Sequence, residues 1–308
     1  MGGRDLLRTL AVTGLLLVTA CSAAHRPADD AGGGRPRTEL ADAERELLGR
    51  AEQRLIADCM RDKGFRYGPG PAPDRPRGKA PERRFGLDDV AWARRHGYGL
   101  AEEARSGDRD GKAADGNSPR ARYVASLPPR RKAEFDRALN GTDRAAIVVP
   151  APGRGQIFTS ADGCQADARR RLYGDLRKWT EAKAAVLNLE YVTYDAVVAE
   201  PRYTRAAAGW QSCMKARGLA YPNSSEAIGA VVKENRSRTA GKAWRHEVTV
   251  AVADAECNRA VGLARTGAHL QKEHVREAAR HEFARQTRYY TRAVTTALGR
   301  ARSVVRSG

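Results

Sequence analysis

The sequence predicts an all-α, disulfide-stapled protein of two related halves behind a lipidated flexible N-terminus. Two observations predict the helical halves. The pattern Cys-Met-x-x-x-Gly-x-x-Tyr occurs twice, at 59–67 and at 213–221, with an offset of 154 residues (213 − 59). Apolar residues also recur at helical spacing through most of the chain, whereas only 147–149 resembles a strand. Each copy of the pattern is typical of a helix that ends at its glycine.

The amino-terminal segment has the features of a secretory signal. Arg4 and Arg8 form a short basic region, and an apolar run over 10–18 follows it. The next residues, Val18-Thr19-Ala20-Cys21, resemble the bacterial lipobox, which implies cleavage after Ala20 and a diacylglyceryl thioether on Cys21. An ordinary signal peptide with an incidental cysteine is the alternative. We therefore expect a chain anchored to the cell membrane, on its extracytoplasmic face, through lipid on Cys21.

Composition and motifs divide the chain into four parts. Residues 1–20 are the lipoprotein signal peptide, and 21–43 form a lipidated, disordered tether that is small, polar and rich in Gly and Pro. The 22 residues from Ser22 to Ala43 (43 − 22 + 1) have a root-mean-square reach of about 25 Å. The first helical half, with Pro/Gly-rich loops, covers 44–159. The second, with a long carboxy-terminal helix, covers 160–308.

The first half begins with a helix over 44–63, because Leu48, Ala51, Leu55 and Cys59 share one helical face. A proline-rich crossing over 69–81 follows. The later predictions for this half are a short helix capped by Asp88 or Asp89 and ending at His96, a Gly/Asp-rich loop over 106–117, a helix from Pro128 to Asn140, and a packed loop or lone strand at 147–149.

The second half is expected to be nearly all helix. Ser160 is the predicted N-cap of its first helix, which carries Cys164 and Leu172 on one face. The later predictions are a helical run from Trp179 to Ala196, a helix from Pro201 to Gly218, a helix capped at 224–226, a helix over 244–263 and one long charged helix over 269–300. The three tryptophans of this half are expected in the core: Trp179, Trp210 and Trp244.

Four cysteines remain when Cys21 carries lipid, and an even number in an exported protein predicts disulfides. Cys164 and Cys257 both follow a similar Ala-Asp lead-in within a predicted helix. Each half would then hold one Cys-Met helix and one such partner, which favours Cys59–Cys164 and Cys213–Cys257. The rival pairing, Cys59–Cys213 with Cys164–Cys257, would join the halves to each other.

The chain is strongly basic. Lys and Arg number 55 against 37 Asp and Glu, which gives a net charge of +18. Such a charge would suit anionic lipid headgroups, wall polymers or nucleic acid as partners. The favoured interpretation is that an Ala- and Arg-rich composition reflects a GC-rich genome, because the basic residues are spread along many predicted helices and not concentrated in one block. Aromatic residues make up only 6% of the chain, which is few for base stacking, and export also argues against nucleic acid.

Motifs for catalysis or cofactor binding are missing. The sequence has no Cys-x-x-Cys, no Gly-x-Ser-x-Gly and no His-Glu-x-x-His. His274 and His281 form at best a weak metal pair, and a solvated helix face is the simpler interpretation. Met60 and Met214 each follow a repeat cysteine, which would suit copper(I), but a core methionine beside a disulfide is the favoured interpretation. We therefore expect no catalytic residue, no metal and no cofactor.

Three stretches carry a family resemblance: Trp210-x-x-Cys213-Met214-x-x-x-Gly218, Leu172-Tyr173-Gly174-Asp175, and Phe85-Gly86-Leu87-x-Asp89 with Gly97-Tyr98-Gly99. Here and over most of the mature chain, the sequence resembles uncharacterised secreted lipoproteins of actinobacteria. The resemblance implies an exported, membrane-anchored protein, and it implies no catalytic residues. Some members accompany envelope transport systems, which points to an envelope protein as a partner.

The expected function is that of a non-enzymatic envelope lipoprotein. Its partner would be a component of an envelope transporter or an anionic wall or lipid polymer. One alternative is a helical enzyme acting on the cell wall, which would need a cleft with clustered acidic residues. A copper or redox module is the other alternative, and it would need reduced Cys59 and Cys213.

Overall fold

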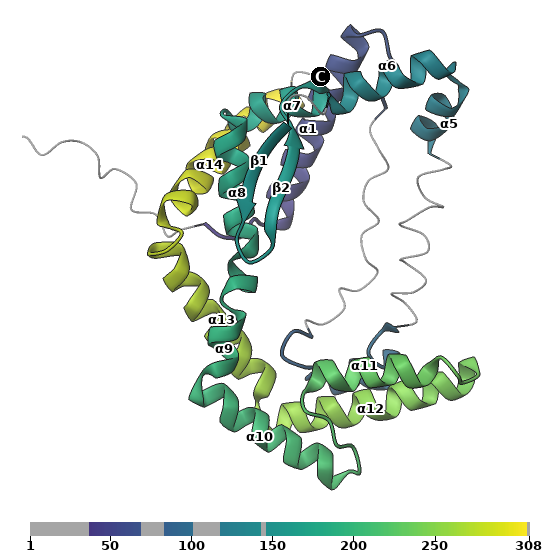
Figure 1. Cartoon of the computed structure of the whole chain (residues 1–308), viewed down its shortest axis with the longest axis vertical. Coiled ribbons are helices and arrows are strands. Elements are labelled where there is room, and N and C mark those ends of the chain that lie inside the picture. The colour runs from purple at the N-terminus through teal and green to yellow at the C-terminus, as the bar shows by residue number, and fades with distance from the viewer. Residues whose placement is uncertain (1–36, 69–82, 101–117, 143–145, 307–308) are drawn as a thin grey trace, which may run out of the picture. The chain divides into compact units, whose positions relative to one another are not determined.

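A computed structural model describes residues 37–68, 83–100, 118–142 and 146–306 (Figure 1). It confirms the all-α class, with a helical fraction of 74% and one small two-stranded sheet. The predicted signal peptide, Cys21, most of the tether, the proline-rich crossing and the 106–117 loop lie outside the described residues. In the described ranges, no helix combines the length and the apolar character needed to cross a bilayer.

The elements follow one another in the chain as α1 (Asp42–Asp62), α2 (Val90–His96), α5 (Pro119–Ser126), α6 (Pro129–Asn140), β1 (Ala146–Ala151), β2 (Gly155–Ser160), α7 (Gly163–Tyr173), α8 (Leu176–Val192), α9 (Tyr194–Ala199), α10 (Pro201–Ala216), α11 (Ser224–Asn235), α12 (Ala240–Val261), α13 (Leu263–Arg280) and α14 (Ala284–Arg306).

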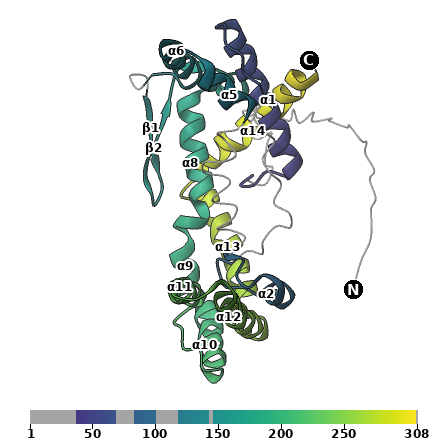
Figure 2. The same ribbon diagram turned by 90° about the vertical axis from the view of Figure 1, so that its right-hand side faces the viewer.

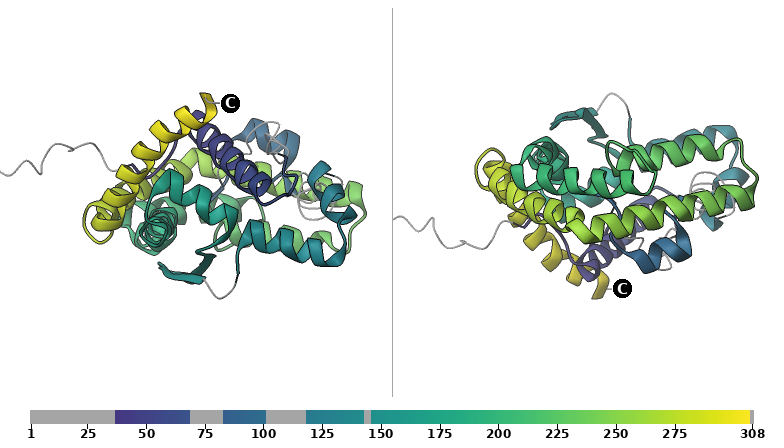
Figure 3. Two further views of the ribbon diagram at one scale, coloured as in Figure 1. Left: turned by 90° about the horizontal axis from the view of Figure 1, so that it is seen from above. Right: turned by 90° about the horizontal axis from the view of Figure 1, so that it is seen from below.

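The larger core lies where α1, α7, α8 and α14 pack together. Figure 3 shows α1 and α14 side by side. Apolar residues on the inner faces of the four helices fill this core, among them Leu55, Leu172, Trp179 and Val294. The Trp179 ring stacks between Tyr173 and Tyr290, with ring centroids 3.8 Å and 5.4 Å away. An aromatic stack from three helices therefore links α7, α8 and α14.

A second group of helices packs around α12, which contacts α2, α10, α11 and α13. Figure 3 shows α11 running alongside α12. Trp210 and Met214 of α10 are buried against Ala253 and Cys257 of α12. Tyr98, which follows α2, is buried with Val231 of α11 and Val250 of α12.

Each group combines helices from both sides of residue 160. α1 packs on α7 and α14, whereas α2 packs on α12. Each group also holds one Cys-Met helix together with its partner helix, α1 with α7 and α10 with α12. The two stapled helix pairs are thus related in local structure, and their supporting helices alternate along the chain.

The expected loop or lone strand at 147–149 is instead β1 of an antiparallel hairpin. β1 pairs with β2, with Val149 opposite Ile157 and Val148 opposite Phe158. The hairpin lies against α8 (Figure 2). Ile147, Val149 and Ala151 alternate onto the buried side, as a half-buried strand requires. Gly153 and Gly155 have positive φ values at the tight connection between the strands. β2 was not predicted from the sequence because its only strongly apolar residues are Ile157 and Phe158.

The single long helix expected over 269–300 is two helices, α13 and α14. The chain breaks at 281–283, where the Phe283 N–H donates to the Ala278 carbonyl at 2.8 Å. This interruption of the helix allows the Phe283 side chain to be buried in a small core with Leu189 of α8 and Ala279 of α13. Burial of this aromatic ring outweighs the continuous helical ladder that the sequence favoured.

Three smaller expectations are also wrong. Asp162, not Ser160, is the residue before α7, because Ser160 still belongs to β2 and its hydroxyl donates to Asp162 at 2.6 Å. Asn223, one residue before the predicted stretch, caps α11 by accepting from the Glu226 N–H. Trp244 is 37% exposed on α12 and does not fill the core, unlike Trp179 and Trp210.

Both copies of the repeated pattern end their helix in the same way. Gly64 and Gly218 have φ values of 76° and 74°. The next residue's N–H bonds back to the methionine carbonyl, from Phe65 to Met60 at 2.9 Å and from Leu219 to Met214 at 3.0 Å. This is the Schellman arrangement of a helix C-terminus, in which glycine supplies the left-handed conformation. Both methionines are fully buried.

Candidate functional site

The two disulfides join Cys59 to Cys164 and Cys213 to Cys257. This confirms the predicted pairing and excludes the rival one. The Cα atoms are 5.6 Å apart in both bridges, within the usual range. Each bridge fixes the last turns of a Cys-Met helix to a later helix. Because each of the four sulfurs is bonded to its partner in one of the two disulfides, none is a free thiolate that could bind copper.

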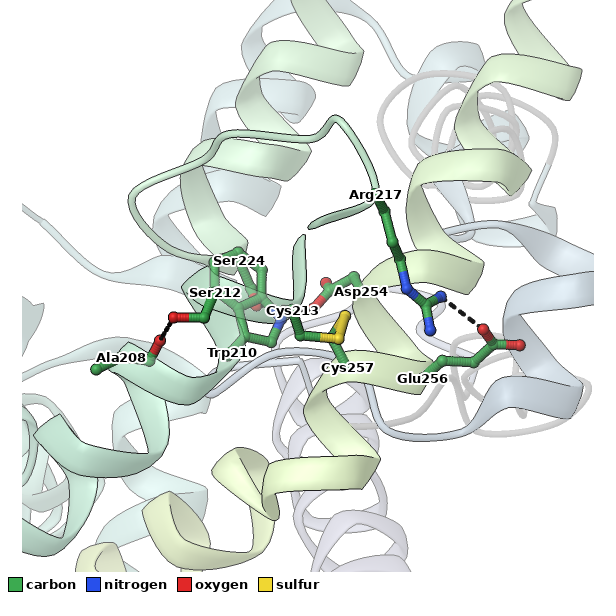
Figure 4. The surroundings of a disulfide bond; sticks show 9 residues. All are labelled: Ala208, Trp210, Ser212, Cys213, Arg217, Ser224, Asp254, Glu256 and Cys257. Carbon is green, nitrogen blue, oxygen red and sulfur yellow. Dashed lines mark hydrogen bonds and ion pairs between the residues drawn. A yellow bond between two sulfur atoms is a disulfide. The ribbon is translucent and has the colours of Figure 1, made fainter. Parts of the chain in front are cut away.

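A buried carboxylate lies beside the second disulfide (Figure 4). Asp254 of α12 is 0% exposed and accepts hydrogen bonds from three side chains. The Trp210 indole N–H donates at 2.8 Å, the Ser224 hydroxyl at 3.0 Å and the Tyr98 hydroxyl at 3.1 Å. These donors come from α10, from the start of α11 and from the segment after α2. Asp254 therefore joins three separate parts of the chain to α12.

Burial raises the pKa of Asp254 from 3.8 to about 6, and the hydrogen bonds from Trp210, Ser224 and Tyr98 hold it below the value that burial alone would give. Burial also raises the pKa of Tyr98, and the adjacent carboxylate of Asp254 raises it further. A carboxyl group with a raised pKa is often a catalytic acid or base. Asp254 has no exposed surface, however, so a substrate proton does not reach it in this conformation.

Two further polar residues on α12 hold the 83–100 segment. Buried Glu247 accepts from the backbone N–H groups of Tyr98 at 2.9 Å and Leu100 at 3.1 Å. Buried Asn258 donates to the Phe85 carbonyl at 3.0 Å and accepts from the Ala264 N–H at 2.8 Å. These bonds satisfy backbone groups that would otherwise be buried without partners. Their role is structural, since each carboxylate or amide is occupied by the fold itself.

Sequence reasoning treated Asp254 only as a lead-in to Cys257 and did not single out Glu247 or Asn258. A signal was present, because the three residues are spaced by seven and four positions. They therefore share one helical face, between apolar neighbours such as Val250 and Ala251. A polar stripe on an otherwise apolar face indicates buried hydrogen bonding.

Glu256 lies at the surface near the second disulfide. Its carboxylate pairs with Arg217 at 2.6 Å and Arg94 at 3.2 Å (Figure 4 shows the Arg217 pair). The hydrogen bond from Arg217 is the largest cause of its lowered pKa, and Arg94 adds to it. Val90, Ala91, Arg259 and Ala260 complete a shallow pocket around Glu256 and Arg94. This carboxylate is held ionised by two guanidinium groups, which does not suit general acid chemistry.

Near the first disulfide, arginine side chains stack on aromatic rings. The Arg120 guanidinium lies 4.1 Å from the Tyr67 ring centroid, and Arg131 lies 4.3 Å from that of Phe65. Phe65 and Phe135 also pack edge to face. Tyr67 is the last residue of the first repeat, so these contacts attach the exit of α1 to α5 and α6. Each such pair contributes about 0.5–1 kcal/mol at an exposed site.

The histidines do not converge. His274 lies 3.2 Å from Glu200, and His281 pairs with Glu277 at 3.3 Å. Across the described ranges, no three His, Cys, Asp or Glu side chains gather in a way that would hold a metal ion. Cys21, the predicted lipid-bearing residue, lies outside those ranges.

The most one-sided charge distribution among the helices is that of α14. It carries six arginines and no acidic residue over its 23 positions. All six are exposed, and four of them lie along one side of the helix: Arg288, Arg292, Arg302 and Arg306. Because its opposite side is buried against α1 and α8, α14 presents these cations on a fixed support.

None of the protein-family models, characterised proteins or solved structures compared with this chain matches it. The buried carboxylates are engaged by the fold, Glu256 is held between two guanidinium groups, and α14 offers a surface for anions.

Proposed function

We propose that the protein is a non-enzymatic lipoprotein of the cell envelope, anchored to the outer face of the membrane through Cys21, that binds an anionic partner. The observation that carries the proposal is α14, a 23-residue helix with six arginines and no acidic residue. Guanidinium groups bind phosphate and carboxylate groups strongly. The amino-terminal signal with Cys21 and the two disulfides support an extracytoplasmic location.

A cell-wall enzyme remains the alternative, and Asp254 with its raised pKa is the residue closest to a catalytic group. Its three side-chain donors and its complete burial favour a structural role instead. The copper module is disfavoured because Cys59 and Cys213 form disulfides. The sequence resemblance to secreted actinobacterial lipoproteins, some of which accompany transport systems, keeps an envelope protein with an acidic surface among the partners to be tested.

A pull-down tests the proposal. The full-length protein is expressed with a carboxy-terminal tag, its envelope is solubilised, and the co-purifying lipids, polymers and proteins are identified. An unrelated exported lipoprotein of the same net charge serves as the control. The proposal predicts an anionic component enriched over the control and lost at high salt. Recovery of nothing beyond the control would refute it, as would a turnover of wall fragments that depends on Asp254.

A further inference from the structure

Four arginines form a continuous face on α14. Arg288, Arg292, Arg302 and Arg306 are separated by 4, 10 and 4 residues, which places them within an arc of about 80° on an α-helix. All four are exposed. The 18 helical steps from Arg288 to Arg306 (306 − 288) span about 27 Å along the axis. We call these four residues the arginine face.

The arginine face has a fixed direction, and its guanidinium groups are not engaged in ion pairs within the described part of the chain. Tyr290, Val294 and Ala297 on the other side of α14 are buried in the larger core, so the helix cannot rotate. In the described part of the chain, none of the four arginines pairs with a carboxylate within 4.0 Å. Glu44, which lies near Arg302, is already bound by Arg37 at 2.7 Å.

The exposed residues between the arginines are small or polar, and Val304 and Val305 are half-buried against the larger core. Thr295, Thr296 and Gly299 are all exposed. A surface that inserts into a bilayer presents large apolar side chains, and this one does not. Its chemistry fits contact with phosphate groups at a surface, driven by charge.

The amino-terminal end of the described chain lies on the same helix. The Arg37 backbone N–H donates to the Thr291 hydroxyl at 3.2 Å, and Thr291 lies between Arg288 and Arg292 in the sequence. Arg37 lies only 16 positions after Cys21 (37 − 21). Such a chain reaches at most about 58 Å when extended, and has a root-mean-square reach of about 22 Å when flexible. A membrane anchor at Cys21 therefore keeps the arginine face within a few nanometres of the bilayer.

We infer that the arginine face docks the protein on the anionic phospholipid bilayer that carries its anchor, with α14 lying along the membrane surface. The inference rests on the proposed function for the anchor at Cys21, and it names the anionic partner as the lipid headgroups of that membrane. A basic residue near an anionic surface contributes about 1 kcal/mol, so four together give on the order of 10³-fold in binding. The lipid anchor and the arginine face then act as two linked contacts, which raises the occupancy of each.

Vesicle binding by the unlipidated mature chain tests this face separately from the anchor. The protein is residues 21–308 with Cys21→Ser, and cosedimentation is measured with vesicles of phosphatidylcholine alone and with one-third phosphatidylglycerol. We expect binding only to the anionic vesicles, and a loss when the ionic strength rises from about 0.05 M to about 0.3 M. Binding that is equal on both vesicles, or unchanged by salt, would overturn the inference.

Two charge-matched variants locate the binding. The first changes the arginine face: Arg288→Gln, Arg292→Gln, Arg302→Gln and Arg306→Gln. The second removes four exposed arginines carried by or next to α10, α11 and α12: Arg205→Gln, Arg236→Gln, Arg245→Gln and Arg259→Gln. Glutamine keeps helix propensity, and circular dichroism checks that both variants fold. We expect at least a 100-fold loss for the first and less than a 10-fold loss for the second. Equal losses would mean that net charge alone binds.

A third arm separates lipid from wall polymer. Soluble poly(glycerol phosphate) is added as a competitor at a phosphate concentration equal to that of the vesicle surface. Vesicles that retain the protein support the membrane as partner, whereas complete displacement would overturn that assignment. The Cys21→Ser full-length protein, fractionated from cells, tests the anchor independently. If the unlipidated chain does not bind anionic vesicles but Cys21 of the full-length protein is lipidated in cells, the membrane-docking role of the arginine face is refuted and the proposed anchored function stands. If Cys21 is not lipidated in cells, the proposed anchored function is refuted.

Discussion

Asp254 shows how one residue can look catalytic and still be structural. Its raised pKa follows from burial, and its hydrogen bonds come from Trp210, Ser224 and Tyr98 of three different segments. Burying a carboxylate costs desolvation free energy, and the hydrogen bonds from these three donors offset part of that cost. The second disulfide then closes the same region, since Cys257 follows Asp254 by three residues.

Asp254→Asn should destabilise the protein by about 1–3 kcal/mol at neutral pH, because the amide nitrogen cannot accept the hydrogen bonds that a carboxylate oxygen accepts. The effect should depend on pH. The folded pKa of about 6 exceeds the unfolded value of 3.8, so the folded state binds more protons between these values. The stability of the wild type relative to the variant should therefore fall as pH rises from about 4 to about 6.

Urea unfolding of both proteins at several pH values measures this difference, and the other titrating groups cancel in the comparison. A stability difference that is constant from pH 4 to pH 7 would contradict the burial of an ionisable Asp254. A variant that unfolds with the same midpoint as the wild type at every pH would show that the three hydrogen bonds contribute nothing.

At the scale of the element, the repeated pattern is a way of ending a helix. Gly64 and Gly218 adopt positive φ, and the following N–H bonds back to the buried methionine. The cysteine one residue before that methionine staples the same turn to a second helix. The glycine, the methionine and the cysteine therefore fix the direction in which the chain leaves each helix.

Two glycines on α1 and at its end should respond in opposite ways. Gly64→Ala should cost about 1–2 kcal/mol, because φ is 76° there and an alanine Cβ is strained in the left-handed region. Gly49→Ala, inside the exposed part of the same helix, should stabilise by about 0.5–1 kcal/mol, because nothing lies within 4 Å of the added Cβ. Thermal unfolding of the two variants tests this. A gain in stability for Gly64→Ala would contradict the helix-end geometry.

The sequence was sufficient for most helices, because their signals are local. Asp89 caps α2 and α6 ends at Asn140, as the capping and glycine signals predicted. It was insufficient where a distant contact decides. The hairpin partner of 147–149 and the break before Phe283 both depend on packing against α8, which no local pattern contains. The buried bonds of Glu247 and Asn258 were missed for the same reason.

At the scale of the whole molecule, two disulfides hold two groups of helices. Cys59–Cys164 closes a separation of 105 residues, and Cys213–Cys257 closes one of 44. The shorter bridge lies within the α12 group, while the longer one joins α1 to α7 beside α14.

Replacing both cysteines of a bridge by alanine should therefore have unequal effects. The chain-entropy model gives a loss of about 5 kcal/mol for the Cys59–Cys164 pair and about 4 kcal/mol for the Cys213–Cys257 pair. Guanidinium unfolding of the two double variants measures both losses. A larger loss for the shorter loop would show that local packing around Asp254, and not loop closure, sets the contribution of the second bridge.

The proposed attachment to a membrane is tested most directly by the mass of the mature amino terminus. The protein is purified from the envelope of cells that express the full sequence, and its amino-terminal peptide is measured by mass spectrometry. We expect a peptide that begins at Cys21 and carries a diacylglyceryl group. An amino terminus at another residue, or an unmodified Cys21, would contradict it.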